Sequence, residues 1–106
     1  MVARVQIPKE AKRGEIIEIR IVIQHPMETG FRRDDVGRPI KRNVITAFSC
    51  KFNGAQIFRA DMSSGISANP YLQFYTVAQA SGEFEFYWID DEGNQGLEHQ
   101  SIVVSG

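Results

Sequence analysis

The sequence predicts an all-β domain, and three observations support this. Apolar and polar residues alternate with a period of two in most of the apolar segments, as in half-buried strands. Turn-forming pairs, such as Asn53-Gly54 and Ser81-Gly82, separate these segments. No window of helical length shows a helical period. Seven such segments in 106 residues indicate one domain, residues 1–106, folded as an immunoglobulin-like antiparallel β-sandwich of about seven strands.

The N-terminal part contains a short strand, "ARVQIP", and a longer one, "GEIIEIRIVIQ". Four isoleucines share one face of the longer strand: Ile17, Ile19, Ile21 and Ile23. We expect that face in the core, because β-branched residues suit a pleated surface. Ile16 and Val22 interrupt the opposite, polar face, which indicates that this face is also partly covered.

The next two strands form the clearest hairpin. "NVITAFSCKF" places four apolar residues on one face: Val44, Phe48, Cys50 and Phe52. Asn53-Gly54 then supplies the two positive-φ residues of a type I′ turn, and "AQIFRAD" returns as the partner strand.

Three strands complete the chain. "PYLQFYTVAQ" is apolar in part on both faces. In "EFEFYWID", Phe84, Phe86 and Trp88 alternate with more polar residues, and we expect Trp88 in the core. After the turn cluster "DDEGNQG", "LEHQSIVVS" is the last strand.

Charge and hydropathy exclude several classes of function. The net charge of −1 argues against binding nucleic acid or an acidic membrane, since both need a basic excess. No apolar run approaches the ~20 residues of a membrane span, so we expect no membrane insertion. The N-terminus "MVARVQIPKEAKRGE" lacks the apolar core of a signal peptide, which by itself predicts a cytoplasmic protein.

The candidate reactive residues are Cys50, His25 and His99. A β-sandwich with one cysteine, two histidines and Met27 or Met62 raises the possibility of a copper site. However, no histidine follows Cys50 within 48 residues, unlike the cupredoxin pattern. We therefore expect Cys50 to be a buried small hydrophobe and His99 to face solvent. A metal-binding redox sandwich using Cys50 and His99 stays open as the weaker alternative.

No pattern indicates catalysis. A nucleophile needs a base within hydrogen-bond reach, and the sequence places none there. Asp90, Asp91 and Glu92 lie in one turn, but "DDEGNQG" lacks the alternating ligands of a calcium loop. We predict a protein that is not an enzyme and has no cofactor.

The most unusual segment is "HPMETGFRRDDVGRPIKRNV", His25 to Val44, which is long for a connection between strands. Residues 32–42 contain five basic and two acidic residues, whereas the rest of the chain contains seven basic and eleven acidic ones. Phe31 stands beside two arginines, and aromatic and arginine residues are enriched at the centres of protein interfaces. A second unusual segment, "MSSGISANPYLQF", is rich in small polar residues and resembles a shaped surface loop.

These two segments, with "GRPIKRNVI" and "SGEFEFYWIDDEGNQ", make the chain similar to the Z subunit family of the bacterial sulfur-oxidising Sox system. The similarity covers essentially the whole chain, and the combination of "HPMETGF" with "ANPYL" is specific. The resemblance implies a non-catalytic subunit that forms a heterodimer with a Y-type (SoxY) carrier subunit. That partner would bear thiosulfate-derived sulfur intermediates on a cysteine of its C-terminal arm, and we expect no such arm in this chain. The resemblance also implies export with the signal-bearing partner and a periplasmic location.

Two hypotheses follow for binding. An apolar sheet face or edge that includes Ile16, Val22, Tyr75 and Val77 buries against the Y-type partner, and the isolated chain can self-associate through it. The two unusual segments supply further docking residues, for the carrier or for transient contacts with other Sox proteins. These candidates are Met27, Glu28, Phe31, Arg32, Arg33, Arg38, Asn69, Pro70 and Tyr71. The arginines could meet either the sulfonate end of the carried group or an acidic protein surface. A stand-alone module that recognises a protein or glycan stays open as the alternative function.

Overall fold

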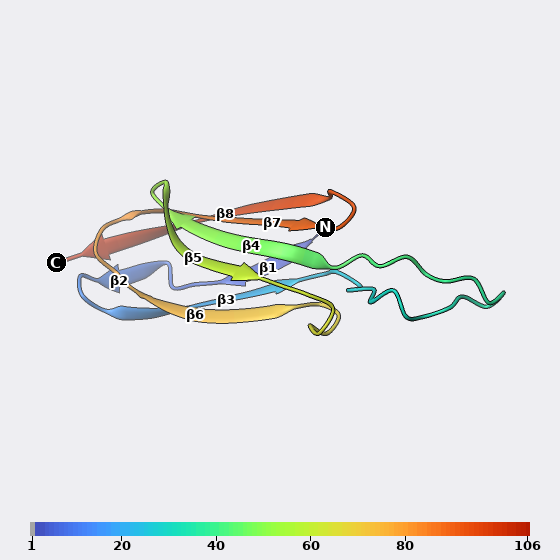
Figure 1. Ribbon diagram of the computed structural model, residues 1–106. Helices are drawn as coiled ribbons and strands as arrows, with labels where there is room; N and C mark the ends of the chain where they lie inside the picture. The colour runs from blue at the N-terminus through green and yellow to red at the C-terminus, as the bar shows by residue number, and fades with distance from the viewer. Residues whose placement is uncertain (1) are drawn as a thin grey trace.

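The computed structural model describes residues 2–106 and contains two β-sheets packed face to face (Figure 1). The smaller sheet has the strand order β1-β3-β6, and the larger has the order β2-β8-β7-β4-β5. The strands are β1 (Ala3–Gln6), β2 (Glu10–Lys12), β3 (Ile16–Ile23), β4 (Ile45–Phe52), β5 (Ala55–Asp61), β6 (Tyr71–Val77), β7 (Gly82–Asp90) and β8 (Gln95–Ser105). The predicted all-β, immunoglobulin-like sandwich is confirmed.

The core lies between the two sheets and comes from the inward faces of the alternating strands. The four predicted isoleucines of β3 are buried, as are Phe84, Phe86 and Trp88 of β7. Phe58 of β5 stacks on Phe74 of β6 with 4.1 Å between the ring centroids. Because β5 and β6 are edge strands of different sheets, this stack closes one side of the sandwich.

The hairpin between β4 and β5 has the predicted turn. Asn53 and Gly54 both have positive φ angles, 48° and 85°, as a type I′ turn requires. Asn53 also accepts a hydrogen bond from the Glu83 N–H through its side chain (3.0 Å), which ties the turn to the start of β7.

Strand β2 differs from the sequence-based expectation. Its three residues were not predicted as a strand, and they pair with β8 in parallel, with Ala11 opposite Val104. The described chain therefore has eight strands, and one of its strand pairs is not antiparallel. A segment of three residues is too short to show a period, and its partner lies at the other end of the chain.

Strand β4 begins with a register shift that the sequence pattern does not show. Val44 and Ile45 are adjacent, yet both are fully buried. The shift lies between Ile45 and Ala47 in the pairing of β4 with β7. It changes which side chains point into the core there. After it, Phe48 and Cys50 are buried as predicted and Phe52 is partly buried.

The molecule is elongated because the connection between β3 and β4 projects from one end of the sandwich (Figure 1). The structure measures 61 × 19 × 19 Å, and its radius of gyration is 16.4 Å, against about 13 Å for a compact domain of this length. The connection between β5 and β6 and the turn between β7 and β8 lie at the same end, opposite the C-terminus. No helix of the described residues is long and apolar enough to cross a bilayer.

Candidate interaction surfaces and the base of the projecting loop

We refer to residues 28–43 as the projecting loop. Its base is held by a buried polar pair, His25 and Asp90, whose Nε2 and Oδ2 atoms are 3.1 Å apart. Both residues are almost fully buried, at 3% and 5% exposure. The Met27 N–H donates to Nδ1 of His25 (2.9 Å), so Nδ1 carries no proton. Nε2 therefore carries the proton of a neutral imidazole and donates to the Asp90 carboxylate.

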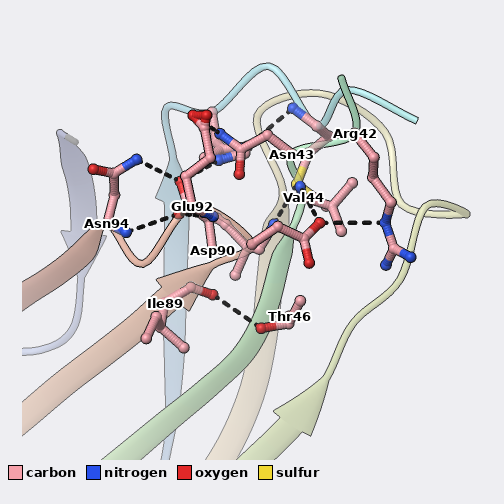
Figure 2. A network of polar contacts seen from close by, with 12 residues as sticks. Arg42, Asn43, Val44, Thr46, Ile89, Asp90, Glu92 and Asn94 are labelled. Carbon is pink, nitrogen blue, oxygen red and sulfur yellow. Dashed lines mark hydrogen bonds and ion pairs between the residues drawn. The ribbon is translucent and has the colours of Figure 1, made fainter. Parts of the chain in front are cut away.

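Asp90 organises the turn between β7 and β8 as well. Its carboxylate accepts hydrogen bonds from the Glu92 N–H (3.0 Å) and from both the N–H and the side-chain amide of Asn94 (2.9 and 3.1 Å) (Figure 2). Burial raises the pKa of Asp90, but the hydrogen bonds from Asn94 and His25 outweigh it and leave this pKa below its ordinary value. Asp90 is thus a charged acceptor that joins the turn to the base of the loop.

Three further residue pairs fix the base. The Val44 N–H donates to the Asp91 carboxylate (3.0 Å), and the Asp91 N–H donates to the Val44 carbonyl (3.0 Å). Arg42 forms an ion pair with the same carboxylate at 3.2 Å (Figure 2). The His25 N–H donates to the Asn69 side chain (3.1 Å), and the Asn69 N–H donates to the His25 carbonyl (2.8 Å). The two segments singled out in the sequence are therefore hydrogen-bonded to each other.

The projecting loop itself is a narrow two-stranded ladder. Glu28 and Asn43 exchange two backbone hydrogen bonds of 2.9 Å, and the Ile40 N–H donates to the Arg32 carbonyl (2.9 Å). Gly30 has a φ of +92°, and a Cβ atom there would lie 3.0 Å from Cβ of Arg42. The two sides of the loop thus approach closely at a position that only glycine fits well.

The tip is closed by a side chain. The Asp34 carboxylate accepts hydrogen bonds from the N–H groups of Val36 (3.0 Å) and Arg38 (2.9 Å). Arg33 donates to the Gly37 carbonyl (2.8 Å) across the same turn. Such an Asx-type arrangement fixes the backbone of a turn by local bonds.

A second candidate surface is the outer face of the β1-β3-β6 sheet. Five of its large apolar side chains are exposed: Ile16, Val22, Tyr71, Tyr75 and Val77. Register places Ile16 opposite Val77 and Val22 opposite Tyr71, so the apolar residues form a pair at each end of the face. We call this the apolar face.

The polar residues between these two pairs satisfy one another. Arg20 forms an ion pair with Glu18, which lowers the pKa of Glu18. The Tyr75 hydroxyl donates to Glu18 (3.2 Å), and Gln73 donates to the Tyr75 hydroxyl (3.1 Å). A partner can therefore cover this strip of the apolar face with a smaller desolvation penalty than isolated charges would cause.

The structure places the candidate docking residues at four locations: the projecting loop, its base, the apolar face and the interior. Phe31, Arg32, Arg33 and Arg38 are exposed on the projecting loop, and Glu28 is partly buried and paired with Arg32. Asn69 is exposed beside the base, and Tyr71 lies on the apolar face. Met27 and Pro70 are buried, which differs from the expectation that they lie at a surface. Met27 turns inward with a φ of 51°, and its sulfur accepts the Ile45 N–H at 3.3 Å.

Cys50 and His99 lie on opposite faces of the larger sheet. Cys50 is fully buried, and burial raises the pKa of its thiol to about 12. His99 is half exposed and contacts Glu83 with 2.8 Å between Nδ1 and Oε1. The alternative of a shared metal site on these two residues is therefore wrong, because the sheet separates them. Among residues 2–106 no group of three or more metal-ligating side chains is present.

Comparison with protein families identifies the chain. The family model described as sulphur oxidation protein SoxZ matches residues 5–100. The chain belongs to the SoxZ family. The resemblance found in the sequence is confirmed, and with it membership of a sulfur-oxidation system. A comparison with curated protein sequences finds no significant match.

Solved structures share the SoxZ-family chain's sandwich. Superoxide reductase (neelaredoxin) from Ignicoccus hospitalis is similar with a TM-score of 0.78 and 16% identity, over 99% of this chain and 81% of that one. A putative superoxide reductase from Thermotoga maritima gives 0.77 and 14%, over 98% and 86%. The sulfur carrier protein SoxY from Chlorobium limicola f thiosulfatophilum gives 0.68 and 9%, over 98% and 79%. These likenesses show a common fold.

The sequence analysis missed the role of two residues of this SoxZ-family chain. Asp90 was expected only to form the turn and His25 was considered only as a reactive residue, yet the two side chains contact each other and join the base of the loop to the turn between β7 and β8. A signal was present in the sequence. His25 continues the inward alternation of β3 by one step, and Asp90 continues that of Phe84, Phe86 and Trp88. Two polar residues at inward positions need partners, and these two are partners.

Proposed function

We propose that this chain is the non-catalytic scaffold subunit of a sulfur-carrier complex. It forms a heterodimer with a SoxY-type carrier, whose C-terminal arm cysteine bears thiosulfate-derived sulfur intermediates, and helps to present that carrier to the enzymes of sulfur oxidation. The observation that carries the proposal is the match of the SoxZ family model to residues 5–100.

The apolar face supports the heterodimer. Stable subunit interfaces are rich in apolar and aromatic residues and resemble a core cut in half. The outer face of the smaller sheet exposes Ile16 at 70%, Tyr75 at 60% and Tyr71 at 53%. We assign this face to the carrier subunit, and in its absence to self-association of the chain.

The state of Cys50 supports a role without cargo. The thiolate is the nucleophile in thiol chemistry, and a thiol with a pKa of about 12 is almost entirely protonated near neutral pH. Cys50 is also fully buried. The sulfur cargo is therefore assigned to the partner's cysteine.

The decisive experiment is native mass spectrometry of this chain, alone and co-expressed with the SoxY-type subunit from the same source. We expect a one-to-one complex that survives dilution. Ile16→Asp with Val77→Asp tests the apolar face, and Leu97→Asp with Val103→Asp is the matched control. The control residues have a similar exposure but lie on the larger sheet.

Loss of the complex in Ile16→Asp with Val77→Asp, but not in the control pair, assigns the carrier interface to the apolar face. A chain that stays alone beside a folded carrier removes the scaffold function and favours the stand-alone recognition module. Equal complex formation by both variant pairs keeps the heterodimer and moves the interface away from the apolar face.

We further propose a periplasmic location, reached by export together with the signal-bearing carrier. Such export requires the complex to form before translocation, which a large apolar interface favours. Cell fractionation tests this. The chain is expected in the periplasm when the carrier is present and in the cytoplasm when the carrier's export signal is deleted.

A further inference from the structure

We propose that the projecting loop, residues 28–43, is a preformed docking element that binds an acidic surface on a protein partner other than the carrier. This inference rests on the proposed function, since the partner would be an enzyme that acts on the carrier's cargo. It assigns that enzyme a binding site separate from the apolar face.

The loop has a defined conformation in the single chain. Backbone hydrogen bonds join its two sides at Glu28–Asn43 and at Arg32–Ile40, and the Asp34 carboxylate closes the tip. His25 and Asp90 fix its base. A loop held in one conformation loses little entropy on binding, so contacts at its tip add directly to affinity.

Large apolar side chains of the loop are exposed to solvent. Phe31 is 88% exposed and Val36 is 73% exposed. The other six phenylalanines of the chain are buried or partly buried in the sandwich. An exposed aromatic side chain on a rigid loop is the type of residue that anchors a protein interface in a partner's pocket.

The loop is also the most basic part of the chain. Residues 32–42 contain five basic and two acidic residues, while the rest of the chain contains seven basic and eleven acidic ones. Arg32 is paired with Glu28 and Arg42 with Asp91. Arg38 and Lys41 are exposed and have no ion-pair partner among residues 2–106. The loop therefore presents uncompensated positive charge, whose complement is an acidic surface.

A small sulfur oxyanion fits these observations less well. The guanidinium of Arg32 donates through two nitrogens to the two carboxylate oxygens of Glu28, so its fork is occupied. Arg33 donates to the Gly37 carbonyl. An anion site also gives no role to Phe31, whereas a protein surface with an apolar pocket uses both the aromatic residue and the charges.

The position of the loop allows both partners to bind at once. It extends along the long axis, beyond the ends of the strands, whereas the apolar face lies along β3 and β6 (Figure 1). A carrier covering the apolar face leaves the tip of the loop in solvent.

The test uses the heterodimer, with purified sulfur-oxidation enzymes from the same source as probes. Binding is measured by biolayer interferometry at low and high salt. The variants are Arg38→Glu with Lys41→Glu, and Phe31→Ser, none of which removes a hydrogen bond within the loop. The control is Lys9→Glu with Arg13→Glu, an equal charge change at exposed positions that flank β2, which lies toward the end of the molecule opposite the loop (Figure 1).

We expect at least one enzyme to bind the wild-type heterodimer with a dissociation constant that rises about tenfold or more in both loop variants and also rises with salt. The control variant should bind this enzyme as wild type does. Equal binding by wild type and loop variants, or equal weakening in the control, overturns the inference. Displacement by free sulfite beyond that caused by sodium chloride of equal ionic strength also overturns it, because it indicates an anion site.

Native mass spectrometry separates the two proposals. Loss of the carrier complex in the loop variants would place the loop at the carrier interface, and failure of wild type to form that complex removes the proposed function itself.

Discussion

The Nε2 atom of His25 lies 3.1 Å from Oδ2 of Asp90, and both side chains are withdrawn from solvent. His25 ends the inward row of β3, and Asp90 ends the inward row of β7. The pair therefore joins the two sheets at the end from which the projecting loop leaves the sandwich. The orientation of the loop depends on a buried polar contact between sheets.

Asp90→Ala should destabilise the chain strongly. The substitution leaves the His25 Nε2–H and the Asn94 donors without an acceptor in a buried environment. Loss of a charged acceptor with several donors costs about 3 kcal/mol of unfolding free energy. Urea denaturation followed by Trp88 fluorescence measures this. Asp61→Ala is the control, because Asp61 is exposed and pairs only with Arg59, so about 0.5 kcal/mol or less is expected there. Similar losses in the two variants would contradict the assigned role of Asp90.

The lowered pKa of Asp90 predicts an acid-sensitive fold. Because the folded-state pKa lies below the unfolded value of about 3.9, the carboxylate contributes stability above that value and loses it as the pH falls through the folded pKa. The urea midpoint of the wild type should therefore fall as the pH drops below about 4.

The urea midpoint of Asp90→Asn should be lower than that of the wild type near neutral pH. It should also fall less than the wild-type midpoint as the pH drops below about 4. Glu18 and Glu28 also have lowered pKa values, each because of a hydrogen bond from an arginine, but they are more exposed and remain in both proteins. The difference between wild type and variant isolates Asp90. Parallel acid profiles would show that Asp90 does not cause the pH dependence.

The fold was predictable from local patterns, whereas the contacts made by the two unusual segments were not. The isoleucine row of β3 and the Asn53-Gly54 turn each specify their structure within about ten residues. Met27 was expected to dock on a partner, because it is an apolar residue in a polar loop. Its burial follows from a contact with the Ile45 N–H, which lies far along the chain. The partner of His25 is 65 residues away, so its identity depends on which strands pair.

Cys50 should be inert in the folded chain. It is fully buried, and its pKa of about 12 leaves almost no thiolate in neutral solution. With Ellman's reagent at about pH 8, we expect negligible reaction under native conditions and one thiol per chain after unfolding in urea. The proposed SoxY-type carrier, whose arm cysteine we expect to be exposed, serves as the positive control. Rapid modification of the native chain would show that Cys50 is accessible, and would reopen a direct role for it in sulfur chemistry.

Gly96→Ala should damage the core next to Trp88. A Cβ atom on Gly96 would lie 2.0 Å from Cε2 of Trp88, which is fully buried and cannot move without disturbing the core. Overpacking of this type costs about 1–3 kcal/mol or prevents folding. Gly65→Ala is the matched control, because its nearest neighbour would be the Ser63 hydroxyl at 4.0 Å and its φ is not positive. The fluorescence spectrum of Trp88 and the urea midpoint are the measurements. We expect both to change in Gly96→Ala and neither to change in Gly65→Ala, and an unperturbed spectrum in Gly96→Ala would mean that the indole does not lie over this glycine.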